Sequence, residues 1–563
     1  MDDSYKYFFM RFIRPHATIM STLIVLSFTS TLFSLVTPIL EKSLVDDVFI
    51  GRRTDLLGYI LIATAGIYIV SSLSTFFSSY KKGKLDLILF NDVANEAFNS
   101  IQIAPIMETQ EMKVGDLLSR IVVNTRSAIN MFTFIIPEFI INSIRVITPV
   151  IIMLFLDMKL AIVVIIPALL FLVPMIFFGK RLEDTQRTSL AKTAEIYSFL
   201  KENLSMIPLI KVFGLERWSQ SKFNEQMKDY YDASMDYTKN SSLNSSVESL
   251  MFGVPMILLI LLGSPMVMNG SLTIGTFTAF MSYIALFFAP IRQFSFLWSF
   301  YKSSSPAFDR VNKILKLEND NGGEKELAIK DGSIEFEDVW FSYNSRSILC
   351  DFSANFRKGL NYIVGDNGVG KSTILKLLCS LYPLERGHIK IDGQDISNIK
   401  KLDLRKKISM IFSEPYLFDG SIYENIHIGS LSASKEEVIH AAKQVSVHEF
   451  VISLSQGYET QVGENGLKLS SGEKQKIALA RAVLKNSPII LLDEVTKSID
   501  ADSRRSINEV IKRLKNEKTI IIITHNTNEI ERGSNVVYLG KDWQKKDYAG
   551  NYIDVTMSKN AFS

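Results

Sequence analysis

Six stretches of almost uninterrupted apolar residues fill the first half of the chain, and the second half has none of comparable length. A bilayer core needs about 20 apolar residues per helix, so each stretch predicts a membrane-spanning helix. The predicted spans are approximately 17–40, 57–79, 130–156, 160–179, 247–268 and 273–301. Beyond residue 305, short apolar runs alternate with polar segments, which is typical of a soluble domain.

Basic residues cluster on one side of these spans. The links between the third and fourth spans and between the fifth and sixth carry almost no charge, whereas the longer connections are rich in lysine and arginine. Positively charged flanks stay in the cytoplasm, so we expect the N-terminus, both long connections and the C-terminal half there. The first outer loop, with Lys42, Arg52 and Arg53, weakens this orientation without reversing it. The basic flanks are Arg11, Arg14, Lys81, Lys82, Lys84, Lys180, Arg181 and Arg187.

The length of 563 residues exceeds one ordinary core, so we expect a multi-domain membrane protein. The pattern favours an all-α six-helix transmembrane domain over 1–318, a linker over 319–333 and a soluble α/β domain over 334–563. A net charge of +3 is too small for the basic face of a nucleic-acid-binding protein. Two cysteines, Cys350 and Cys379, cannot staple so large a fold and favour a reducing compartment. Because the N-terminus lacks the layout of a signal peptide, we expect the first span to be retained.

Several polar residues interrupt the predicted spans. Glu138, Asn142 and Arg145 are spaced i, i+4 and i+7 in the third span, so they share one helix face. Glu248 in the fifth span and Arg292 in the sixth are similar. Ionisable groups at membrane depth are costly and usually face a cavity or one another. They are therefore candidates for a substrate cavity, with interhelical pairing as the alternative.

A glycine-rich loop follows the predicted strand LNYIV. The sequence GDNGVGKS at 365–372 fits the pattern GxxxxGK[ST] and precedes an apolar segment that predicts a helix. Backbone N–H groups of such a loop bind phosphates, its lysine reaches the β- and γ-phosphates, and its hydroxyl ligates Mg²⁺. We therefore expect ATP to bind Gly365, Asp366, Asn367, Gly368, Val369, Gly370, Lys371, Ser372 and Thr373.

Two further apolar strands end in residues suited to phosphate chemistry. In SPIILLDEV, the strand 489–492 delivers Asp493 to the Mg²⁺ region and places Glu494 to polarise the attacking water as a general base. The run TIIIITH presents His525 at the end of another strand, where we expect it to contact the γ-phosphate. The second half is thus predicted to be an α/β P-loop nucleotide-binding domain.

With these motifs in order, the chain resembles an ATP-binding-cassette (ABC) exporter half-transporter. The resemblance implies that Tyr343 stacks on adenine and that Asp500 belongs to a dimer-contact loop. It also implies that Ser470, Ser471, Gly472 and Glu473, in LSSGE, form the signature loop that completes the ATP site of a partner subunit. In the membrane half, KVGDLLSR at 113–120 and NLSMIPLIKVFGLE at 203–216 resemble the two cytoplasmic coupling segments of the family.

Three positions depart from the family pattern. Ser413 stands where the family has a glutamine, and it is too short to reach both Mg²⁺ and the water in the same way. Ser471 and Glu473 replace the glycine and glutamine of the signature loop LSGGQ. We expect Ser471 to add a Cβ near the γ-phosphate, and Glu473 to add negative charge there unless Lys474 or Lys476 offsets it.

The resemblance implies a dimer that uses ATP and Mg²⁺ to export a small amphipathic substrate, either drug-like or a matured peptide. A homodimer is favoured because no catalytic acid is missing, with a heterodimer as the alternative. Because nothing resembling a peptidase domain precedes the first span, we do not expect a leader-cleaving peptide exporter. A flippase for a lipid-linked molecule and a non-transporting ATP-switched assembly remain competing hypotheses. We expect the protein in the cytoplasmic membrane of a prokaryote, in contact with lipid and not with nucleic acid.

Overall fold

The computed structural model describes residues 3–110, 112–170, 172–344, 346–497, 499–526 and 529–540. The chain forms two compact units. A helical unit comprises Met1–Ile101 and Lys113–Leu317, and an α/β unit comprises Gln102–Met112 and Glu318–Ser563. The short segment Gln102–Met112 therefore belongs to the α/β unit, although helices of the helical unit flank it in the sequence.

The helical unit contains five helical segments that are long and apolar enough to cross a membrane, counted over the described residues. They contain five of the six predicted spans. The fourth predicted span, 160–179, falls on α8 and the beginning of α9, where residue 171 and several side chains lie outside the described residues. The α-helices are α1 Asp3–Phe8, α2 Ala17–Ser43, α3 Thr54–Ile103, α5 Val114–Leu118, α6 Thr125–Asn130, α7 Ile136–Leu156, α8 Met158–Leu170, α9 Leu172–Ser205, α10 Ile207–Val212, α11 Glu216–Met268 and α12 Ile274–Leu315.

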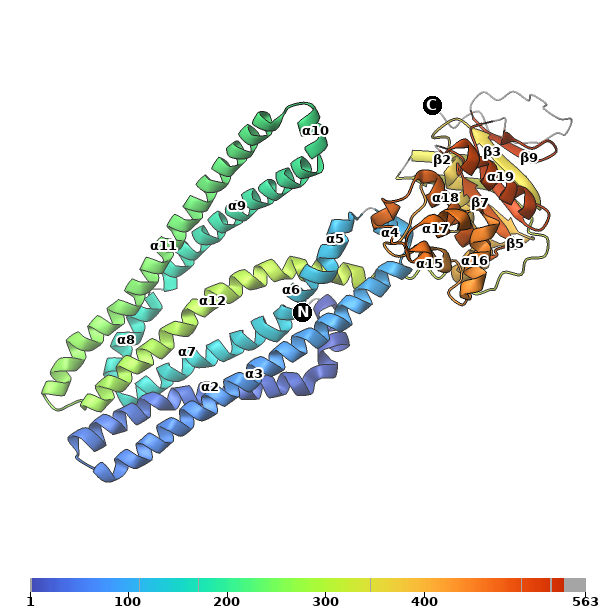
Figure 1. Cartoon of the computed structure of the whole chain (residues 1–563). Coiled ribbons are helices and arrows are strands. Elements are labelled where there is room, and N and C mark those ends of the chain that lie inside the picture. The colour runs from blue at the N-terminus through green and yellow to red at the C-terminus, as the bar shows by residue number, and fades with distance from the viewer. Residues whose placement is uncertain are drawn as a thin grey trace. The chain divides into compact units, whose positions relative to one another are not determined.

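Within this unit, α9 and α11 run side by side and are joined at their far end by the short α10 (Figure 1). α12 packs against α7 and α2. The buried Tyr283 on α12 donates its hydroxyl to the carbonyl oxygen of Leu35 at 2.9 Å. At the beginning of α12, Asp46 accepts hydrogen bonds from the Thr273 hydroxyl and from the Gly275 amide, at 2.5 and 2.7 Å. A carboxylate at a helix N-terminus is stabilising because it satisfies free amides and complements the helix dipole.

The α/β unit contains two sheets. A parallel sheet has the strand order β6-β7-β8-β3-β9, and an antiparallel sheet has the order β2-β1-β4-β5. The strands are β1 Ile334–Tyr343, β2 Arg346–Phe356, β3 Gly359–Gly365, β4 Arg386–Ile391, β5 Gln394–Asp395, β6 Ile408–Ile411, β7 Ile489–Asp493, β8 Thr519–Ile523 and β9 Asn535–Leu539. The helices are α4 Ile106–Gln110, α13 Lys371–Leu378, α14 Lys401–Lys407, α15 Ile422–His427, α16 Lys435–Gln444, α17 His448–Ser453, α18 Ser471–Lys485 and α19 Ala501–Leu514.

Both faces of the parallel sheet are buried, which explains why its strands are continuous apolar runs. Leu491 and Ile521 point into one hydrophobic cluster, whereas Ile490 and Ile520 point into a second one on the other face. β8 pairs with both β3 and β7, and Asp493 lies opposite Ile523. The carboxyl ends of β3, β7 and β8 therefore meet at one edge of the sheet.

One segment from the first half of the chain, α4, packs within the α/β unit. Ile106 and Met107 on α4 pack on the hydrophobic cluster of the α/β unit, and Tyr382 donates its hydroxyl to the Gln110 side chain at 2.5 Å. Residues 113–120, which contain α5, belong to the helical unit. That residues 113–120 form the first coupling segment stays a prediction. The second predicted segment, 203–216, contains α10.

Candidate functional site

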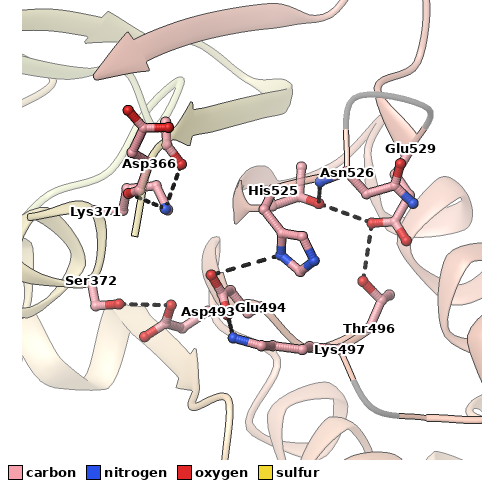
Figure 2. Close-up of polar contacts among 12 residues, drawn as sticks. Asp366, Lys371, Ser372, Asp493, Glu494, Thr496, Lys497, His525, Asn526 and Glu529 are labelled. Carbon is pink, nitrogen blue, oxygen red and sulfur yellow. Dashed lines mark hydrogen bonds and ion pairs between the residues drawn. The ribbon is translucent and has the colours of Figure 1, made fainter. Parts of the chain in front are cut away.

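Three loops meet at the carboxyl edge of the parallel sheet. The loop after β3 leads into α13, which begins with Lys371 and Ser372; the loop after β7 carries Glu494, and the segment after β8 carries His525 (Figure 2). Ligands of open parallel sheets bind at this edge, because it is where loops from neighbouring strands converge. The fold thus brings Lys371 and His525 into one site, although they are more than 150 positions apart in the sequence.

The loop between β3 and α13 has the backbone conformation that its glycines permit. Gly368 and Gly370 have φ angles of +82° and +100°, in a region that other residues seldom adopt. A Cβ on Gly370 would lie 2.7 Å from the Ile348 side chain, so position 370 also has no room for a larger residue. α13 begins at Lys371, which places free amides of a helix N-terminus beside the loop.

Lys371 is folded back onto its own loop. Its ammonium donates hydrogen bonds to the carbonyl oxygens of Gly365 and Asp366, at 2.7 and 2.8 Å, and the side chain is 5% exposed. Burial lowers the pKa of Lys371, and the nearby carboxylates of Glu494 and Asp366 partly offset that effect. A buried ammonium that is hydrogen-bonded to neutral carbonyl groups is well suited to bind an anion.

Ser372 and Asp493 lie together, as the sequence predicts for Mg²⁺ ligands. The Ser372 hydroxyl donates to the Asp493 carboxylate at 2.9 Å, and Asp493 is 6% exposed. Burial raises the pKa of Asp493, and the Ser372 hydrogen bond opposes that rise. Within the described ranges, no group of three or more His, Cys, Asp or Glu residues could hold a metal alone. One carboxylate and one hydroxyl nevertheless fit Mg²⁺, which usually completes its shell with water and substrate phosphates.

Glu494 follows Asp493 directly and has a positive φ of +47°, which turns the chain sharply after β7. Its amide donates to the Ile523 carbonyl at 3.1 Å, which ties the turn to β8. One carboxylate oxygen lies 2.7 Å from the ammonium of Lys497, and the other lies 3.9 Å from Nδ1 of His525. The structure therefore brings Glu494 and His525 together, as expected, and adds Lys497, which the motif comparison did not single out.

Tyr343 lies at the end of β1 among other aromatic residues. Its ring meets those of Phe341 and Tyr382 edge to face, with ring centres 4.7 and 5.2 Å apart. Burial raises the pKa of Tyr343, while a hydrogen bond with Thr373 of the phosphate loop opposes the rise. The aromatic residue assigned to adenine therefore lies near the phosphate loop.

Ser413 lies in an exposed loop whose backbone is fixed by α18. The buried Gln475 donates its side-chain amide to the carbonyl oxygens of Phe412 and Ser413, at 3.2 and 2.7 Å. The loop that lacks the family's glutamine is thus held by a different glutamine, which sequence reasoning missed. The available signal was a polar residue on the otherwise apolar face of the helix that follows LSSGE.

The signature residues Ser470 and Glu473 have a local structural role. The Ser470 hydroxyl accepts from the Glu473 amide, and the Glu473 carboxylate accepts from the Ser470 amide at 2.8 Å. This reciprocal pair is the capping box at the beginning of α18. Glu473 is therefore directed back along its own helix. The spacing S-x-x-E before an apolar helix was the sequence signal for this role.

Gly472 lies where the N-termini of α18 and α19 approach each other. A Cβ at this position would lie 2.8 Å from the Ser503 hydroxyl and 3.0 Å from the Asp500 carboxylate. Asp500 caps α19 by accepting a hydrogen bond from the Ser503 amide at 2.8 Å. The signature loop and the predicted dimer-contact residue Asp500 are thus neighbours in the α/β unit.

The helical unit groups three of the five predicted cavity residues. Asn142, which is 1% exposed, donates to the carbonyl and carboxylate oxygens of Glu138, at 2.8 and 3.3 Å. Arg145 donates through Nε to the hydroxyl of Thr31 on α2 at 3.2 Å. The side chains of Glu248 and Arg292 lie outside the described residues. A cavity of about 290 Å³ is lined by Ser34, Leu35, Asn142, Arg145, Leu286, Ala289, Pro290 and Gln293.

Two family models match the chain. The one described as the ABC transporter transmembrane region matches residues 20–291, and the one described as ABC transporter matches residues 350–497. The fold is similar to a solved structure described as a bacterial Atm1-family ABC exporter with ATP bound, with a TM-score of 0.79 and 23% identity, over 93% of this chain and 94% of that chain.

Two relatives are similar along almost their full length. YgaD of Bacillus subtilis strain 168, named as a multidrug export ATP-binding/permease protein, is 29% identical over 94% of this chain and 94% of its own. An ATP-dependent lipid A-core flippase of Syntrophus aciditrophicus strain SB is 28% identical over 94% of this chain and 89% of its own. Both names describe ATP-driven movement of a molecule, but they specify different cargoes.

Proposed function

The chain belongs to the ABC exporters, as a half-transporter whose ATP hydrolysis is coupled to transport in a dimer, and from this premise we propose its cargo and its catalytic residues. The cargo is a small amphipathic molecule, drug-like or a matured peptide, and the favoured assembly is a homodimer in the cytoplasmic membrane of a prokaryote. The convergence of Lys371, Asp493, Glu494 and His525 at one sheet edge, in a chain with a helical membrane domain, carries this proposal.

In the ATP site, Lys371 binds the phosphates and Tyr343 stacks on adenine. The Ser372 hydroxyl and the Asp493 carboxylate hold Mg²⁺, which supplies positive charge to the phosphate oxygens when bound. Glu494 orients a water molecule and takes its proton. The water oxygen then bonds to the γ-phosphorus as the bond from that phosphorus to the β–γ bridging oxygen breaks, giving ADP and phosphate. His525 donates to a γ-phosphate oxygen, and the signature loop of the partner subunit covers the other side.

The cavity between α2, α7 and α12 supports an amphipathic cargo. Its lining combines the polar Asn142, Arg145 and Gln293 with apolar residues such as Leu35 and Leu286. A volume of about 290 Å³ is near the lower limit for ligand pockets, about 300 Å³. It accommodates a polar head group or one side chain of a cargo. The flippase reading is the second candidate, because a relative with that name aligns along the whole chain.

A transport assay tests this proposal. Inside-out vesicles containing the protein are expected to accumulate a fluorescent amphipathic dye or a labelled short hydrophobic peptide when ATP is added. Vesicles with Glu494→Gln are the inactive control. Movement of a labelled phospholipid alone would favour the flippase. ATP hydrolysis unaffected by every probe, with no accumulation, would reject transport in favour of an ATP-switched assembly.

The adenine assignment has its own test in Tyr343. Stacking of a base on an aromatic side chain contributes about 1–3 kcal/mol, and 1.4 kcal/mol corresponds to a factor of ten. Tyr343→Ala is therefore expected to raise the KM for ATP about tenfold. Tyr343→Phe keeps the ring and should stay close to wild type. Equal KM values for the alanine and phenylalanine variants would contradict the assignment.

A further inference from the structure

Lys497 is bound to the carboxylate on which hydrolysis is proposed to depend. The Lys497 amide donates to the Glu494 carbonyl at 3.0 Å, which closes a turn immediately after β7. This turn directs the lysine side chain back to Glu494, where the ammonium donates to Oε2 at 2.7 Å (Figure 2). The contact therefore follows from the positive φ of Glu494, which bends the chain at that point.

The turn is fixed by a second network. Glu529 accepts hydrogen bonds from the hydroxyls of Thr496 and Thr524, at 3.0 and 3.1 Å, through the same carboxylate oxygen (Figure 2). Thr496 precedes Lys497, and Thr524 precedes His525. The loop that carries Lys497 and the segment that carries His525 are thus joined, so Lys497 and His525 are held on either side of Glu494.

The ion pair with Lys497 engages the Glu494 carboxylate, which is the group proposed to activate the attacking water. Glu494 is 12% exposed, whereas Lys497 is 48% exposed. The hydrogen bond and the charge of Glu494 raise the pKa of Lys497. The ammonium occupies Oε2, and Oε1 faces His525, so the attacking water must compete with these two groups for the carboxylate. Ion pairs with an exposed lysine add little to the free energy of unfolding. The Lys497–Glu494 contact is therefore not explained by stability alone.

We propose that Lys497 is a positioning residue that holds the Glu494 carboxylate away from the attacking water while ATP is bound. In the ATP-loaded site the ammonium competes with the attacking water for the Glu494 carboxylate, so this contact must break before the carboxylate can act as base. Lys497 therefore slows hydrolysis. This inference rests on the proposed role of Glu494 and concerns Lys497, the first residue of the segment KSID that ends in the predicted dimer-contact residue Asp500.

The test measures ATP hydrolysis by the full-length protein in lipid vesicles. Lys497→Ser is expected to raise the basal kcat about two- to fivefold, since a half-exposed ion pair is weak, and to leave the KM for ATP within a factor of two. Lys497→Arg keeps the cation and is expected to restore the slow rate. Lys512→Ser, which removes an exposed lysine from the last turn of α19, is the matched control. If Lys497→Ser is unstable, Lys497→Met takes its place.

Salt gives an independent readout, because the ion pair of a half-exposed lysine is screened. Raising ionic strength is expected to speed the wild type more than Lys497→Ser. A tenfold fall in kcat for Lys497→Ser would assign Lys497 to the chemistry and overturn the proposal. An unchanged kcat with a lower Tm would also overturn it, because the role would be structural. Hydrolysis that persists in Glu494→Gln would instead remove the proposed function of Glu494, so the two failures are distinguishable.

Discussion

Replacing Glu494 with glutamine is expected to lower ATP hydrolysis at least about 100-fold, because general-base catalysis typically contributes 10²–10⁴. Glutamine has nearly the same shape and cannot take the proton of the attacking water. ATP binding should be retained, because the phosphate contacts are assigned to the loop after β3 and the adenine contact to Tyr343. The measurement is the rate of phosphate release alongside equilibrium binding of a fluorescent ATP analogue.

The control for this variant is Glu517→Gln, which removes an exposed carboxylate elsewhere in the α/β unit. It is expected to hydrolyse ATP at the wild-type rate. A Glu494→Gln protein that also hydrolyses at that rate would show that another group activates the water. Loss of ATP binding in Glu494→Gln would point instead to a disturbed turn, since the Glu494 backbone ties β7 to β8.

Replacing Lys371 with methionine is expected to weaken ATP binding about 10- to 100-fold and to stop hydrolysis at ordinary ATP concentrations. Hydrogen bonds to charged groups contribute about 1.5–3 kcal/mol, and each 1.4 kcal/mol is a factor of ten. The ammonium is already desolvated and hydrogen-bonded to two carbonyl groups of the loop. The cost of burying this cation is therefore met largely before ATP arrives, and little of the phosphate attraction is lost to dehydration.

Equilibrium binding of the same ATP analogue measures the expected loss of affinity in Lys371→Met. Lys512→Met, which removes an exposed lysine elsewhere, is the control. The melting temperature of each variant separates loss of binding from loss of fold, because the Lys371 hydrogen bonds also hold the loop. Wild-type affinity in a folded Lys371→Met protein would contradict the assignment of the phosphate loop.

Much of the ATP site could be predicted because its parts are contiguous in the sequence. The phosphate loop occupies 365–373, and Asp493 and Glu494 end one apolar strand. A parallel strand buried on both faces is recognisable as an apolar run, and its carboxyl end meets those of its neighbours. The motifs therefore specify both the residues and the sheet edge to which they belong. For the same reason, the apolar runs of the first half were sufficient to predict a membrane domain.

Local spacing also contained information that the motif comparison passed over. Ser470 and Glu473 have the spacing of a capping box, which the structure confirms at the beginning of α18. The expectation that Glu473 adds charge beside a phosphate treated it as a free side chain. Because its carboxylate already accepts from the Ser470 amide, its first role is to stabilise the signature helix.

The sequence by itself determined the two classes of domain, the nucleotide motifs and the strands that carry them, because periodicity and contiguous loops are local properties. Only the tertiary structure decided which side chains meet across loops. The pairing of Lys497 with Glu494 depends on the left-handed backbone conformation of Glu494. The hydrogen bond from the Gln475 side chain to the Ser413 carbonyl depends on how α18 packs. The docking of α4 was likewise decided by apolar contacts with a distant core. Such contacts depend on the packing of segments far apart in the chain, which no single stretch of sequence encodes.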